Sequence, residues 1–213
     1  MRGRAVLFLF VLLLLVGCAN LGGKLTTIRS PGVERIPTTI CVHPLLSSPT
    51  RRRYIPRDEV VLSRRRERIY IASPTEVRLS VTPQSQMFTG LLSSELSYYG
   101  FDLKELPVEI PDEAESADSS GNVFFISLDL LKRLKEEYGV EAILIGNVMM
   151  EYAPRYSRTL VTAAYLKLVD IETLDVLCQV HLLSEDYGEE LADAAGALAS
   201  ELALEAGIAR VER

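Results

Sequence analysis

The stretch that decides the fold is Val140-Glu141-Ala142-Ile143-Leu144-Ile145-Gly146-Asn147-Val148-Met149-Met150. It is a nearly continuous apolar run, which is typical of a strand buried on both faces. A helix is expected just before it, between Ser127 as the cap and Gly139 as the stop, because apolar side chains recur there at helical spacing. A buried strand that follows a helix indicates a sheet covered by helices.

Two further strands are expected downstream. The first is Thr159 to Asp170, and the second is Leu174 to Leu182, where apolar side chains alternate with period two. Only Ile171-Glu172-Thr173 separates them, so the sequence predicts an antiparallel hairpin. A last helix is expected from about Asp186 to Ala206, with Gly207 as its stop.

Upstream, the sequence predicts a strand at Thr38 to Leu46, a helix from Pro83 to Tyr99 and a short strand at Phe101 to Leu106. Thr82 suits the helix cap, and proline suits the first helical position. The full order is strand, helix, strand, helix, strand, strand, strand, helix. We therefore predict one three-layer α/β domain, with helices on a mixed sheet of about five strands and a C-terminal antiparallel hairpin plus helix.

The first 17 residues have the parts of a bacterial secretion signal. Arg2 and Arg4 form a basic start, and Ala5 to Val16 is an unbroken apolar run of the length found in cleaved signals. The next two residues, Gly17 and Cys18, resemble the lipobox, in which a small residue precedes the cut and the thiol carries the lipid. The alternative is an ordinary signal, or an anchor helix, with a chance cysteine.

The resemblance implies lipidation at Cys18, including a palmitate-type acyl chain, and an anchor in the outer membrane. Ala19 stands where Asp would direct retention in the inner membrane, so the usual sorting rule favours the outer membrane and a domain that faces the periplasm. Residues 18–37 are expected to be the lipidated N-terminus and a flexible tether. Residues 38–213 are expected to be a single domain.

Composition narrows the classes of function. Of the 213 residues, 48% are apolar and 24% charged, as in globular domains. Without Arg2 and Arg4 the mature chain has 21 basic and 29 acidic residues, a formal charge of −8. This acidic balance argues against a nucleic-acid-binding protein.

The basic residues concentrate in an insertion at residues 50–80, which holds nine arginines against four acids. Glu67 to Ile71 and Val77 to Val81, around Pro74, are expected to pair as a hairpin. Two interpretations stay open: a solvated excursion, or a basic patch that contacts anionic lipid headgroups, a glycan or an acidic partner. The candidate partner-binding residues are Arg51, Arg52, Arg53, Arg64, Arg65, Arg66 and Arg68.

Lipidation would leave two cysteines, Cys41 and Cys178. The periplasm permits a disulfide between them, but both fall on apolar faces of different expected strands, and we favour two buried free thiols.

We expect no metal, cofactor or enzymatic activity. Neither cysteine has metal-ligand spacing with His43 or His181. The acidic segment 107–121 lacks the ligand spacing of a calcium loop. Ser47 and Ser48 lie near His43, but no Gly-x-Ser-x-Gly sequence surrounds them.

Three segments are similar to one known family. The first is Lys135-Glu136-Glu137-Tyr138-Gly139-Val140-Glu141-Ala142-Ile143-Leu144-Ile145-Gly146-Asn147-Val148, which resembles a helix, Gly-Ala-Asp, strand and Gly segment. The second is Leu166-Lys167-Leu168-Val169-Asp170-Ile171-Glu172-Thr173, which resembles a strand and its turn, and the third is Thr82-Pro83-Gln84-Ser85 at a helix start. The family is the curli-secretion lipoprotein superfamily, which includes the curli export channel, lipoprotein activators of penicillin-binding proteins and small outer-membrane lipoproteins.

Two departures from the family stand out. Leu174 occupies the position where the family usually has glycine in the turn. The curli channel builds its pore from long hairpin insertions, whereas only Glu151 to Arg158 separates the two central strands here.

The family's motifs indicate a fold rather than an activity. We interpret the chain as a non-catalytic, lipid-anchored interaction protein that faces the periplasm and recruits or regulates an envelope assembly. Its partners would be the membrane, through the lipid, and an envelope protein. The alternatives are an auxiliary lipoprotein of a lipid-transport system, or a ring of identical chains in a secretion system.

Overall fold

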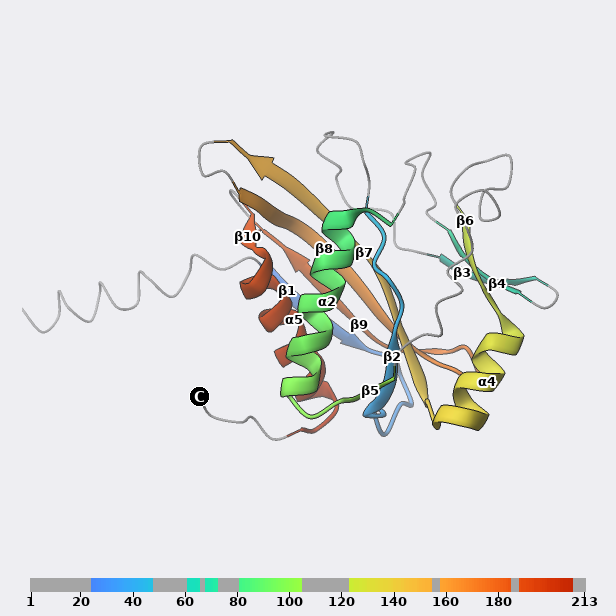
Figure 1. The fold of residues 1–213 in the computed structure, drawn as a ribbon. Coiled ribbons are helices and arrows are strands. Elements are labelled where there is room, and N and C mark those ends of the chain that lie inside the picture. The colour runs from blue at the N-terminus through green and yellow to red at the C-terminus, as the bar shows by residue number, and fades with distance from the viewer. Residues whose placement is uncertain are drawn as a thin grey trace, which may run out of the picture.

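The computed structural model describes residues 24–47, 61–65, 68–72, 81–104, 123–154, 158–184 and 188–208. They form a mixed sheet of seven strands, three helices and a separate three-stranded sheet (Figure 1). The strands of the main sheet are β1 (Lys24–Arg29), β2 (Thr39–Val42), β5 (Asp102–Lys104), β7 (Ala142–Ala153), β8 (Arg158–Asp170), β9 (Val176–Leu183) and β10 (Glu189–Glu190). The helices are α2 (Pro83–Tyr98), α4 (Leu128–Tyr138) and α5 (Leu191–Glu205), and the second sheet consists of β3 (Val61–Arg65), β4 (Arg68–Ala72) and β6 (Val123–Ser127).

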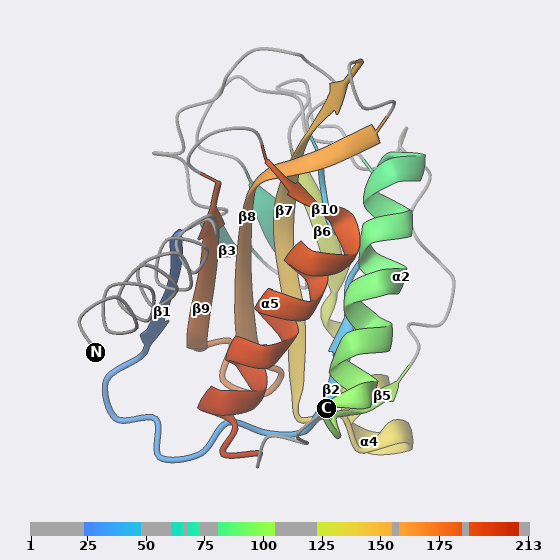
Figure 2. The same ribbon diagram turned by 90° about the vertical axis from the view of Figure 1, so that its left-hand side faces the viewer.

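The main sheet has the strand order β1-β9-β8-β7-β2-β5, with β10 paired to β8. Strand β2 is parallel to both β7 and β5, and the other pairs are antiparallel. Helices α2 and α5 lie side by side on one face, and α4 lies on the other (Figures 1 and 2). The predicted three-layer α/β class is therefore confirmed.

Each of the eight expected elements has a counterpart: β2, α2, β5, α4, β7, β8, β9 and α5. The C-terminal hairpin of β8 and β9, followed by α5, is also confirmed. Within the described part of the chain, no helix is both long and apolar enough to cross a membrane.

Strand β7 is buried on both faces, as its apolar run predicts. Ala142, Leu144 and Val148 pack into the core under α2 and α5. Ile143 and Ile145 pack into the second core, under α4. One strand thus supplies side chains to two cores.

Helix α2 begins as expected. The Thr82 hydroxyl accepts from the Ser85 backbone N–H at 3.1 Å, and the Ser85 hydroxyl accepts from the Thr82 N–H at 2.9 Å. This reciprocal capping box satisfies two backbone donors that the helix leaves open. The helix then buries Phe88, Leu92 and Leu96, each worth roughly 1.5–3 kcal/mol of transfer free energy.

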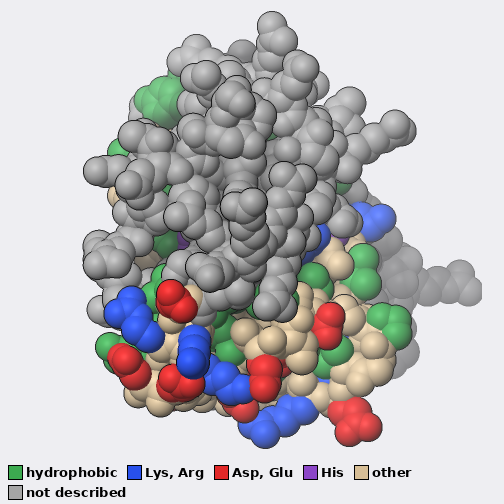
Figure 3. Space-filling model, turned by 90° about the vertical axis from the view of Figure 1, so that its right-hand side faces the viewer, with side chains coloured by type: hydrophobic (Ala, Val, Ile, Leu, Met, Phe, Trp, Pro, Cys, Tyr) green, Lys and Arg blue, Asp and Glu red, His purple; other side chains and the backbone are tan. Residues whose placement is uncertain are grey.

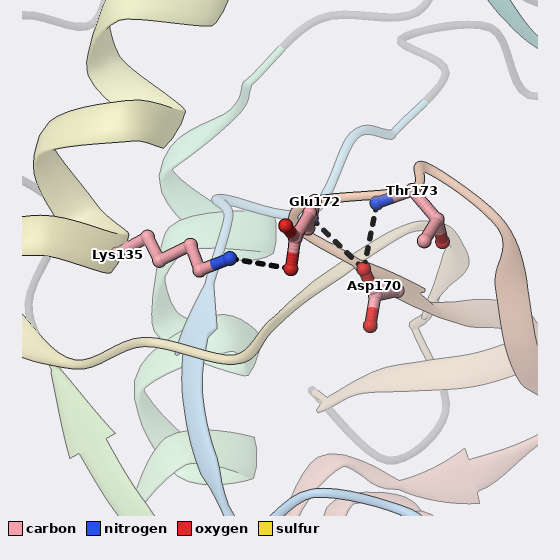
Figure 4. Close-up of polar contacts among 4 residues, drawn as sticks. All are labelled: Lys135, Asp170, Glu172 and Thr173. Carbon is pink, nitrogen blue, oxygen red and sulfur yellow. Dashed lines mark hydrogen bonds and ion pairs between the residues drawn. The ribbon is translucent and has the colours of Figure 1, made fainter.

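The family-like turn between β8 and β9 is organised by Asp170 (Figure 4). Its carboxylate accepts from the backbone N–H groups of Glu172 and Thr173, both at 2.8 Å. Lys135 from α4 forms an ion pair with Glu172, which ties the turn to the helix. Leu174 has a φ of 66°, a left-handed conformation that suits glycine.

The expected tether is shorter than the sequence suggested. Residues 24–29, placed in the tether, form β1 and pair with β9 over six residues. Ile36 is also buried in the core under α2 and α5. Thr26, Thr27 and Ile28 are β-branched and suit a strand. Their partner is the open edge of β9, a long-range contact that local sequence does not reveal.

The expected hairpin in the insertion is partly wrong. Strand β4 matches its first half, but β4 pairs with β3 and with β6 rather than with Val77 to Val81. Arg65 and Arg68 are opposite each other where the antiparallel pairing of β3 and β4 ends. Residues 73–80 lie outside the described residues.

The two cysteines are free and buried, as favoured from the sequence. Cys41 belongs to the core under α4, and Cys178 to the core under α2 and α5. They therefore lie on opposite sides of the sheet, and β7 and β8 separate their strands. Burial raises the pKa of both thiols to about 12, so neither is a reactive thiolate at neutral pH.

Gly146 allows β8 to approach β7 closely. A Cβ atom on this glycine would lie 2.2 Å from the Tyr165 carbonyl oxygen and 2.9 Å from the Leu166 side chain. The exposed Gly90 in α2 has no atom within 4 Å of such a Cβ. The packing of β8 on β7 therefore requires a glycine at position 146, whereas packing does not require one at position 90.

We predict that Gly146→Ala lowers the free energy of unfolding by about 2–3 kcal/mol, because the methyl group meets backbone. Gly90→Ala should raise it by about 0.5–1 kcal/mol, because alanine restricts the unfolded chain and favours the helix. Urea denaturation followed by circular dichroism measures both. An unchanged midpoint for Gly146→Ala would contradict the close approach.

Candidate contact surfaces

The basic residues of the insertion are only partly within the described structure. Arg64 and Arg65 lie in β3 and Arg68 in β4. The other candidates, Arg51, Arg52, Arg53 and Arg66, lie outside the described residues. The candidate surface therefore has a described part, which we call the arginine hairpin: the paired strands β3 and β4.

The register of the arginine hairpin concentrates positive charge at its end. Arg65 and Arg68 are directly opposite in register, and Arg64 is opposite Ile69. Like charges in opposite positions destabilise a sheet. An anion bound at this end would relieve the repulsion.

The hairpin is joined to the main domain through β6 and α4. Strand β6 pairs with β4, and α4 begins at Leu128, directly after β6. Leu131 and Leu134 of α4 are buried against the main sheet. The small sheet is therefore connected to the main domain through α4, which packs on the main sheet.

The exposed face of α4 carries both signs of charge (Figure 3). Lys132 lies 3.9 Å from Glu136, an (i, i+4) pair, and Lys135 pairs with Glu172. Such exposed pairs contribute little stability and keep the surface soluble. The acidic pair Glu136 and Glu137 is thus part of a solvated face.

The order of the parallel strands reverses at β2. Open α/β sheets usually bind ligands at such a position. Strands β5 and β7 flank β2, and the crossovers run through α2 on one face and α4 on the other, so the switch point is at the carboxyl ends of β2 and β7. Here the chain after β2 continues along β7: Leu46 N–H donates to the Gly146 carbonyl at 3.1 Å, and Val148 N–H donates to the Leu46 carbonyl at 2.8 Å. Buried Leu45 and Leu46 therefore occupy this position.

His43, which follows β2, is buried at this point. Its Nδ1 donates to the Pro44 carbonyl at 2.9 Å. Burial lowers its pKa to about 4, and the Pro44 hydrogen bond opposes that shift. Ser47, the nearby hydroxyl, interacts with Thr82 at 2.8 Å rather than with His43. Ser48 lies outside the described residues.

A row of polar side chains on the α4 side of the sheet was not anticipated from the sequence. Asn147, Tyr165 and His181 are successive partners across β7, β8 and β9, and the Tyr165 and His181 rings are 5.0 Å apart. Lys167, the next position of β8 on this face, is 9% exposed. Period-two alternation was visible in β9, but the alignment of polar positions across three strands depends on register.

Among the described residues, no three His, Cys, Asp or Glu side chains converge as metal ligands do. The acidic segment 107–121 lies outside the described residues.

The central hairpin extends beyond the sheet as an arm. Strands β7 and β8 stay paired from Met150–Val161 to Ala153–Arg158, and β10 pairs with β8 at Leu160 and Val161. Tyr152 in this arm is 54% exposed. We call residues 150–153 and 158–161 the β7–β8 arm.

The fold defines a mixed α/β protein. Its described surfaces offer candidate contact sites, and buried leucines occupy the position where the strand order reverses. No known family model matches the chain, and no curated protein matches it. Two solved structures are similar: the PelC dodecamer from Paraburkholderia phytofirmans and a single-substitution variant of it. They are 12% and 13% identical to this chain, each with a TM-score of 0.47, and each match covers 88% of this chain and 99% of that one.

We predict that the free energy of unfolding falls as the pH drops from 6.5 to 4. Over that range unfolded chains protonate His43 and folded chains do not, so roughly 3 kcal/mol is lost. His43→Gln should remove this part of the pH dependence in urea titrations, while His181→Gln should retain it. Identical slopes in wild type and His43→Gln would contradict the assignment.

Proposed function

We propose that this chain is a lipid-anchored protein of the bacterial outer membrane that faces the periplasm and recruits or regulates an envelope assembly by binding. Catalysis plays no part in this proposal. The observation that carries it is the combination of a lipobox at Gly17 and Cys18 with an arginine-rich insertion in an otherwise acidic chain.

The described structure supports a binding role in two ways. Buried leucines occupy the switch point, where an α/β enzyme would usually hold its substrate. The arginine hairpin gathers Arg64, Arg65 and Arg68 on a separate small sheet. A basic hairpin outside the main core suits electrostatic recognition of an acidic partner.

The anchor is tested at Cys18. We predict that cells fed an alkyne-labelled palmitate incorporate it into the wild-type chain and that Cys18→Ala abolishes incorporation, because the thiol is the acylated group. Cys41→Ala serves as the matched control and should label normally. Equal labelling of the Cys18→Ala and wild-type chains would contradict lipidation at this residue.

The proposed contact surface of the arginine-rich insertion is tested by removing its positive charge. We predict that changing Arg51, Arg52, Arg53, Arg64, Arg65 and Arg66 to serine abolishes crosslinking of one specific envelope protein in native membranes, because the anionic partner loses its counter-charge. Capture by the wild type should also weaken with salt, as exposed charge pairs are screened. Mass spectrometry of the crosslinked species identifies the partner.

The matched control changes the same six residues to lysine, which keeps the charge. Retained capture would show that charge is recognised, whereas loss would show that the arginine fork is required. Circular dichroism checks that each variant folds. Crosslinks between identical chains alone, unaffected by the serine changes, would contradict the adaptor and favour a ring of identical chains.

A further inference from the structure

The short distance between Cys18 and the first strand restricts how the domain sits on its membrane. Strand β1 begins at Lys24, so only residues 19–23 separate it from the lipid-bearing cysteine. Six Cα steps span at most about 20 Å. Lys24 is fixed in the sheet, because β1 pairs with β9 along its whole length. The anchor therefore holds one end of the sheet close to the membrane.

The β7–β8 arm projects from that same end. Lys24 is opposite Leu183, Leu183 opposite Ala163, and Ala163 opposite Met149. Beyond this row β7 continues for four residues to Ala153, which adds about 13 Å at the usual rise of a strand. The length by which the arm projects is thus more than half of the greatest possible distance between Cys18 and Lys24.

The arm is braced at its base and exposes an aromatic side chain. Strand β10 pairs with β8 at its base, and a Cβ on Gly188 would lie 2.8 Å from Leu160, so the packing there is close. Arg158 and Glu190 neutralise each other in an ion pair. Tyr152 is 54% exposed, and Leu183, at the row where the arm begins, is 41% exposed.

We propose that this end of the domain, with Tyr152 and Leu183, rests in the headgroup layer of the membrane that holds the lipid anchor. Tyrosine suits this position because its ring is apolar and its hydroxyl is polar. Little intrinsic affinity is needed, since the anchor makes the contact intramolecular. This inference rests on the lipid anchor of the proposed function.

The absence of tryptophan from the sequence allows a direct test. Tyr152→Trp places a single fluorophore in the arm. Tyr138→Trp is the matched control, because Tyr138 is 47% exposed at the end of α4, next to the opposite end of β7. The full-length lipidated proteins are reconstituted into phosphatidylcholine vesicles with and without brominated acyl chains, and vesicle flotation is measured in parallel.

The expected result is that both proteins float, that emission of Tyr152→Trp is quenched and blue-shifted in brominated vesicles, and that Tyr138→Trp is unaffected. Flotation with no quenching, or with equal quenching of both, would overturn this surface while leaving the anchor intact. A blue shift without bromine quenching would place Tyr152 against protein, such as a second copy, and would also overturn it. Failure to float would refute the anchor, and this inference with it.

Discussion

The burial of β7 on both faces is the constraint on which the other elements depend. The strand supplies alternate side chains to the core under α2 and α5 and to the core under α4. Because neither face meets water, both helical layers are required, and a shift of register by one residue would exchange the two sets. Gly146 then sets how closely β8 can approach, so β7 fixes both the layers and the hairpin.

The same strand links the core to the surface. The first part of β7 is enclosed, whereas its last residues leave the sheet with β8 and form the arm. A protruding hairpin would fray if its edges were free, and β10 covers one of them. The stability of the arm thus derives from the core strand that it continues, which makes it a paired extension of the sheet rather than a loop.

Much of the fold was accessible from the sequence because β2, α2, β5, α4, β7, β8, β9 and α5 each bury a periodic apolar set. Strands β1, β3, β6 and β10 were missed because their places depend on pairing partners that local sequence does not reveal: β9 for β1, β4 for β3 and β6, and β8 for β10. The arginine hairpin was visible as composition, although its register was not. Tyr152 could not be singled out from the sequence, because it enters the proposed membrane contact only through its place at the same end of the sheet as Lys24.

The short link from Cys18 to Lys24 also bears on what the arginine hairpin contacts. Figure 1 shows the small sheet of β3, β4 and β6 on the side of the main sheet where α4 lies, away from the arm. If the arm and Lys24 face the membrane, that end of the domain contacts the lipid headgroups. The arginine hairpin then faces the periplasm. Of the interpretations that composition alone left open, an acidic protein or glycan then fits the hairpin better than the anchoring membrane itself.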